Sequence, residues 1–164
     1  MCRTNSTLTY TLSIGTHLAV IFQKILDAAT SKGVRFVAIN RRGFPGSTPY
    51  TNPELDVVTN ELSTETEKDA FLQDRGHEIT YFIDNFIREH ELPPPSSDGM
   101  NGGVAILGWS LGSSHAAAAV ASTLTLPADV RARLSLHLRS LIFYGELETG
   151  LSVFPVVLTD LLIL

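Results

Sequence analysis

GVAILGWSLG, residues 103–112, followed by the Ala-rich segment 113–121, is the stretch that decides the fold. A short apolar run ended by glycine is typical of a buried parallel strand, and the segment after it has the composition of a helix. The motif G-x-S-x-G lies at this joint, with Gly108 and Gly112 on either side of Ser110. Such a turn strains its central residue, and small neighbours relieve the crowding. We therefore expect Ser110 at the carboxyl edge of a sheet. The other interpretation is a simple Gly-rich turn with an N-cap serine.

Three further segments are predicted strands, residues 8–14, 34–39 and 140–144. Helical patterns lie between them. The clearest begins at Thr64, where Thr64 and Glu67 have the spacing of a capping box, and runs towards Glu91 with one apolar stripe. This alternation predicts an α/β fold with a sheet of about four mostly parallel strands and helices on both faces.

Length and charge restrict the classes of function. The chain has 164 residues, which fit one domain, and its 12 basic and 17 acidic residues give a net charge of −5. This balance argues against a nucleic-acid backbone or an anionic membrane surface as partner. The single cysteine, Cys2, allows no internal disulfide and no Cys-rich zinc site. We expect no cofactor and no metal.

No segment has the pattern of a targeting or membrane-spanning sequence. The weakly apolar residues 8–22 are interrupted by threonine, serine and histidine, unlike a signal peptide. The apolar residues 153–164 include Asp160 and are shorter than the roughly 20 residues that cross a bilayer. We therefore expect no membrane span and a cytoplasmic location.

Through its G-x-S-x-G turn, the chain resembles the α/β-hydrolase superfamily of esterases, lipases and peptidases. In that family the strand–turn–helix around the serine is called the nucleophile elbow, and residues 108–112 are called the elbow below. A second stretch, NRRGFPGS at residues 40–47, is similar to the D-x-R-G-x-G-x-S loop of that family. Arg42, Gly43 and Ser47 match, whereas the acid and the second glycine are replaced by asparagine and proline. The resemblance implies a partial α/β-hydrolase sheet and a structural role for Arg42 and Gly43 in supporting the elbow. The alternative for this loop is an ordinary turn.

The resemblance also implies an oxyanion hole made of two backbone N–H groups. Leu111, the residue after the serine, would supply the first. The second would come from the loop after the first strand, where Gly15 matches the family and Thr16 is the candidate donor. An ordinary turn glycine at Gly15 is the alternative.

The remaining catalytic residues are harder to find. In the family an acid and then a histidine follow the serine, because serine needs a base that a carboxylate orients. Glu146, just past the strand at residues 140–144, is the candidate acid. His115 is rotated by about 140° and raised by about 7.5 Å from Ser110 on one helix, so it cannot reach the hydroxyl productively. His137 is predicted at the opposite edge of the sheet, as a surface histidine.

Two functional hypotheses follow. The first is a serine hydrolase that cleaves a small ester-like substrate, with Ser110 as nucleophile. Since no base is identifiable, we expect residues 1–164 to be a single incomplete α/β-hydrolase domain, truncated before the catalytic histidine and impaired by that loss.

The second hypothesis is a catalytically inactive, hydrolase-like remnant or interaction module. Residues 145–164 form an apolar tail with no visible neighbour to pack against. Exposed apolar segments of this kind promote contacts between chains, so the tail predicts self-association.

Overall fold

The computed structural model describes residues 7–13, 22–98, 101–144 and 156–159. Strands and helices alternate along most of the chain. In order they are β1 (Thr7–Ser13), α2 (Gln23–Ser31), β2 (Val34–Asn40), α3 (Asn52–Thr59), α4 (Glu65–Glu89), β3 (Val104–Trp109), α5 (Gly112–Ala121), the 3-10 helix η1 (Ser122–Thr125), α6 (Ala128–His137), β4 (Leu138–Tyr144) and β5 (Val156–Thr159). The mixed α/β class predicted from the sequence is confirmed.

The strands pair in the order β2-β1-β3-β4-β5. The pairs β1–β2, β1–β3 and β3–β4 are parallel, and β5 joins β4 in antiparallel orientation. Trp109, the last residue of β3, lies opposite Tyr144, the last residue of β4. The segments that follow β2 and β3 therefore leave the sheet at its carboxyl edge, where α/β proteins place their ligands.

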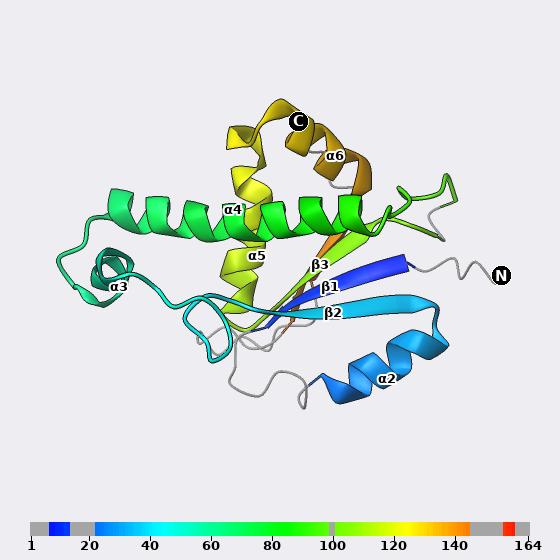
Figure 1. The fold of residues 1–164 in the computed structure, drawn as a ribbon, viewed down its shortest axis with the longest axis horizontal. Helices are drawn as coiled ribbons and strands as arrows, with labels where there is room; N and C mark the ends of the chain where they lie inside the picture. The colour runs from blue at the N-terminus through cyan, green and yellow to red at the C-terminus, as the bar shows by residue number, and fades with distance from the viewer. Residues whose placement is uncertain (1–6, 14–21, 99–100, 145–155, 160–164) are drawn as a thin grey trace.

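Helices lie on both sides of these strands, with α2 on one side and α4, α5 and α6 on the other (Figure 1). The predicted apolar stripe of α4 is confirmed, since Ile79, Ile83 and Ile87 are buried. They share one core with residues of β3 and with Ala116 and Ala119 of α5. The capping box of Thr64 and Glu67 is also present at the start of α4.

A close helix crossing holds α4 against α5, and Figure 1 shows α4 lying across α5. The crossing depends on Gly76, because a Cβ atom there would lie 2.5 Å from the carbonyl oxygen of Ala118. Nearby, the buried Asp84 of α4 binds the guanidinium of Arg133 on α6, with Oδ1 and Nε 2.6 Å apart. Both contacts fix α4 on the helical layer above the sheet.

The structure corrects two expectations. His137 is at the opposite edge of the sheet from Ser110, as expected, but it is buried and not on the surface. Its ring nitrogens lie 2.8 Å from the Arg133 carbonyl oxygen and 3.0 Å from that of Leu92, because the loop after α4 covers the end of α6. The apolar tail is not without a neighbour either, since Val156–Thr159 pairs with β4. Residues 145–155 and 160–164 lie outside the described residues.

Among the described residues, no helix combines the length and the apolar character needed to cross a bilayer.

Candidate active site

Ser110 occupies the turn between β3 and α5 with a backbone φ of +53°. Its N–H donates to the carbonyl oxygen of Tyr144 at 2.9 Å, and its own carbonyl accepts from Ser113 N–H at 2.9 Å. Residues other than glycine rarely adopt positive φ, which costs roughly 1–2 kcal/mol for an L-residue. The strained turn predicted from the motif is confirmed, and the Ser110 side chain is exposed at the carboxyl edge of the sheet.

Gly108 makes this turn sterically feasible. A Cβ atom at position 108 would lie 2.6 Å from Ser113 Cα and 2.8 Å from the carbonyl oxygen of Gly112. Both are backbone atoms of the incoming helix and cannot yield without moving α5. Gly112 is itself buried as the first residue of α5. Gly108 thus lets the helix begin directly against the strand.

One of the two expected oxyanion donors is described. Leu111 precedes α5 as its N-cap residue and is 60% exposed. Its N–H makes no hydrogen bond to any residue that the structure describes. An unpaired N–H at the positive end of a helix dipole is suited to stabilise negative charge. Thr16, the second expected donor, and Glu146, the candidate acid, lie outside the described residues.

His115 is close to Ser110 in the sequence, but its hydrogen-bond partners among the described residues are other groups. Its ring contacts the guanidinium of Arg41 through Nε2, and Nδ1 lies 3.3 Å from the carbonyl oxygen of Leu111. Burial, together with the charges of Arg41 and Arg75, lowers the pKa of His115 from 6.5 to about 4. At neutral pH the ring is uncharged, with Nδ1–H towards Leu111 and the Nε2 lone pair towards Arg41.

The other described histidines have partners elsewhere. His77 binds the hydroxyl of Thr125 at 2.7 Å, and the His90 ring packs against the Phe86 ring at a tilt of 49°. His137 lies at the far edge of the sheet. Within the described part of the chain, no histidine is therefore hydrogen-bonded to Ser110.

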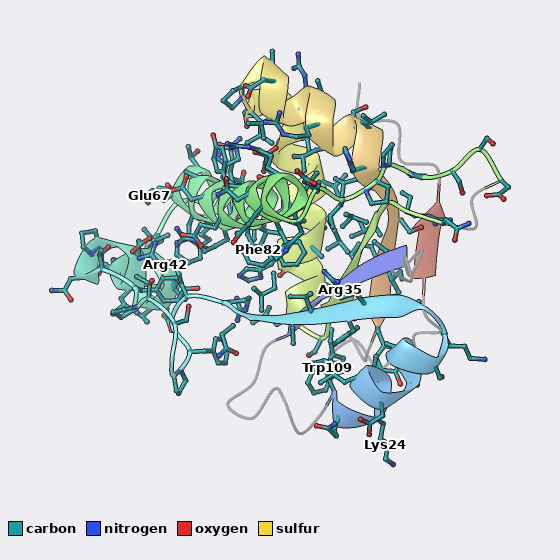
Figure 2. The ribbon with its side chains drawn as sticks, turned by 45° about the vertical axis from the view of Figure 1, so that its right-hand side comes forward. Lys24, Arg35, Arg42, Glu67, Phe82 and Trp109 are labelled. Carbon is teal, nitrogen blue, oxygen red and sulfur yellow. The ribbon has the colours of Figure 1, made fainter. Side chains whose placement is uncertain are left out.

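Arg42 ties the loop after β2 to two helices, and Figure 2 shows it between α3 and α4. It binds both carboxylate oxygens of Glu54, at 2.6 and 2.7 Å, and one oxygen of Glu78 at 3.0 Å. Arg75 of α4, only 4% exposed, binds the same two carboxylates at 3.0 and 2.9 Å. This ion-pair cluster of Arg42, Arg75, Glu54 and Glu78 fixes the loop after β2 to α3 and α4.

Gly43 shapes the same loop. Its φ is +82°, and a Cβ atom there would lie 2.5 Å from Cε2 of Tyr50. The Tyr50 ring in turn lies against the guanidinium groups of Arg42 and Arg75, at 5.5 and 5.4 Å. The glycine therefore allows the loop to close on this aromatic ring.

Sequence reasoning missed the carboxylates of this cluster. One signal was present, because Thr51 and Glu54 have the capping-box spacing that was recognised at Thr64, and α3 does begin there. Hydrogen bonds from Thr51, followed by those from Arg42 and Arg75, lower the pKa of Glu54 to about 2. Nothing in the sequence near Arg75 indicated that it would meet the loop.

A groove of about 420 Å³ opens beside the elbow. Leu111 and Ser114 form its side nearest Ser110, and Arg41 and His115 also line it. Most of the remaining wall is apolar and comes from the segment around α3 and from α4, namely Tyr50, Val57, Val58, Phe71 and Leu72. The groove has the volume and the lining of a small-molecule pocket.

No group of three or more potential metal ligands occurs among the described side chains. Comparisons with protein-family models, with curated proteins and with solved structures find no match for this chain.

Proposed function

We propose that this protein is a serine hydrolase with a partial α/β-hydrolase sheet, in which Ser110 attacks carboxylic esters. The single observation that supports this most is the positive φ of Ser110 between a parallel strand and a helix. Strained residues other than glycine concentrate at functional sites, where the surrounding structure maintains the strain. An ordinary N-cap serine has an extended backbone and does not need this conformation.

The chemistry follows from the position of Ser110. Its hydroxyl oxygen would attack the ester carbonyl, and the N–H of Leu111 would stabilise the oxyanion of the tetrahedral intermediate. Loss of the alcohol would leave an acyl group on Ser110, which water would then release as the acid. The groove beside Leu111 and Ser114 would take an apolar acyl chain, since its wall is mostly apolar.

Activation of the serine sets the expected rate. No described histidine is hydrogen-bonded to Ser110, and His115, with a pKa of about 4, is a weak base at neutral pH. Loss of the base removes most of the rate enhancement of such enzymes but leaves a residual part from the oxyanion hole and binding. We therefore expect slow or no ester turnover, and slow covalent labelling of Ser110.

Labelling with a fluorescent fluorophosphonate probe tests the proposal. The time course is measured for the full chain, for Ser110→Ala and for Ser97→Ala, which removes an exposed loop serine. We expect equal labelling of the unaltered chain and Ser97→Ala, and none of Ser110→Ala. Equal labelling of all three proteins, or no labelling of the unaltered chain, would contradict the proposal.

The second candidate is a hydrolase-like module without catalysis. It is favoured by one observation, namely that none of the described histidines is bonded to Ser110. Ester turnover above background that is lost in Ser110→Ala would argue against it. An unlabelled chain that is folded and associates with other chains would support it.

A further inference from the structure

A second cavity lies apart from Ser110, between the loop after β2, helix α4 and helix α5. Its volume is about 370 Å³, near the lower end of the roughly 300–1,000 Å³ of ligand pockets. Three arginines line it, Arg41, Arg42 and Arg75. Among the described residues, Glu78 is the only carboxylate on its wall.

The charges around this cavity do not balance. Arg42 and Arg75 share the carboxylates of Glu54 and Glu78, so that two cations face two anions. Arg41 has no carboxylate within ion-pair distance among the residues that the structure describes. The described charged groups around the cavity therefore sum to one excess positive charge, that of Arg41.

No anionic group among the described residues neutralises the charge of Arg41. Its guanidinium contacts the neutral ring of His115 and lies 5.0 Å from the centre of the Phe44 ring. Its Nε atom is buried and has no hydrogen-bond partner in the described part of the protein. Burial lowers the pKa of Arg41, which reflects the lost hydration of the cation. A partly dehydrated charge without a counter-ion is costly, and an anion in the cavity would offset that cost.

We infer that this cavity binds a small oxyanion, a carboxylate or a phosphate group, held by the guanidinium of Arg41. The planar guanidinium fork matches two oxygens of either group. Arg42 and Arg75 stay paired with Glu54 and Glu78, so the net attraction for an anion comes from Arg41. The inference does not depend on the proposed hydrolase function, because Ser110 does not line this cavity.

The site is adjacent to the groove beside the elbow. Arg41 and His115 line both the cavity and the groove, and His115 Nδ1 lies 3.3 Å from the carbonyl of Leu111. A bound oxyanion would offset the charge of Arg41, which is one cause of the lowered pKa of His115. The pKa of His115 should therefore rise when the site is occupied.

Nuclear magnetic resonance of the histidine rings provides the test. The full chain is titrated separately with inorganic phosphate and with acetate, with sodium chloride adjusted to keep the ionic strength constant. The His115 signals are assigned by comparison with His115→Gln. We expect a saturable shift of these signals with at least one anion, and a raised pKa of His115 in its presence.

Two variants identify the binding residue. Arg41→Gln should weaken binding by about tenfold or more, the effect of losing a hydrogen bond to a charged group. Arg35→Gln is the matched control, since it removes an exposed charge from the other end of β2, well away from Arg42 in Figure 2. We expect the control to bind as the unaltered chain does.

The outcomes separate the sources of the oxyanion. Saturation by phosphate alone assigns a phosphate group, saturation by acetate alone assigns a carboxylate, and saturation by both supports the shared chemistry. The inference is overturned if neither anion saturates, if Arg41→Gln binds unchanged, or if Arg35→Gln weakens binding equally. Circular dichroism checks the fold of Arg41→Gln. If that variant does not fold, Arg41→Lys, which keeps the charge but loses the fork, replaces it, and unchanged binding would then overturn the role of Arg41.

Discussion

The strain at Ser110 can be measured apart from any activity. Its φ of +53° suits glycine, whereas alanine keeps the penalty of a Cβ atom. We predict that Ser110→Gly is more stable than Ser110→Ala by about 1 kcal/mol. Urea unfolding of both variants gives the difference. If Ser110→Ala were as stable as Ser110→Gly, the turn would not be strained as described.

His115 predicts a pH dependence of stability. Its pKa is about 4 in the folded protein and about 6.5 when exposed, so the unfolded chain binds more protons between these values. The contribution of neutral His115 is therefore fully present above pH 6.5 and is lost as the pH falls to 4. The free energy of unfolding should fall by about 3 kcal/mol over this pH range because of His115.

Urea unfolding at pH 7 and pH 4.5 tests this dependence. We expect the unaltered chain to lose more stability between these two values than His115→Gln does. His90→Gln, which changes an exposed ring, serves as the control and should follow the unaltered chain. The lowered pKa of Glu54, about 2, adds a further loss only from about pH 4.5 downwards. Parallel losses in the unaltered chain and His115→Gln would contradict the burial of this ring.

The crossing of α4 and α5 makes a prediction for these two elements. Gly76→Ala places a Cβ atom 2.5 Å from the carbonyl oxygen of Ala118, so the helices must separate. We expect a loss of about 1–3 kcal/mol, although alanine favours a helix by about 1 kcal/mol. Gln73→Ala, an exposed change on the same helix, should be nearly neutral. A stabilised Gly76→Ala would show that the helices do not cross so closely.

Local pattern was sufficient to predict some of these elements. The capping box and apolar stripe of α4, and the β3–Ser110–α5 turn, each depend on residues close together in the sequence. The role of Gly76 depends on Ala118, which belongs to another helix. Burial of His137 likewise depends on a loop that follows α4. Contacts of this kind have no periodic signal, so the sequence does not reveal them.

The residues of the candidate site also differ in whether they depend on a local motif or on contacts between distant parts of the chain. Ser110, Gly108 and Leu111 were predicted because one motif specifies a strand, a turn and a helix together. The excess charge of Arg41 was not predicted, because it appears only when Glu54 and Glu78 are seen to bind other arginines.

At the scale of the whole molecule, the order of the strands leaves β2 and β5 at the two edges of the described sheet. Unpaired strand edges are sites where chains associate, and we expect association through β5. Sedimentation velocity of the unaltered chain should show an average mass that rises with protein concentration. Val157→Lys on this strand should reduce that rise. Leu62→Lys, a change at an exposed position between α3 and α4, is the control. A monomer at all concentrations would contradict this expectation.

The proposed hydrolysis requires Ser110 as the nucleophile, and mapping of the fluorophosphonate adduct tests this directly. The chain has no lysine or arginine between Arg88 and Arg131, so trypsin leaves the elbow serine, Ser113, Ser114 and Ser97 on one peptide. Fragmentation of that peptide in a mass spectrometer assigns the modified residue. We expect a single adduct, on Ser110. An adduct on any other serine, or an unmodified peptide after prolonged exposure, would contradict it.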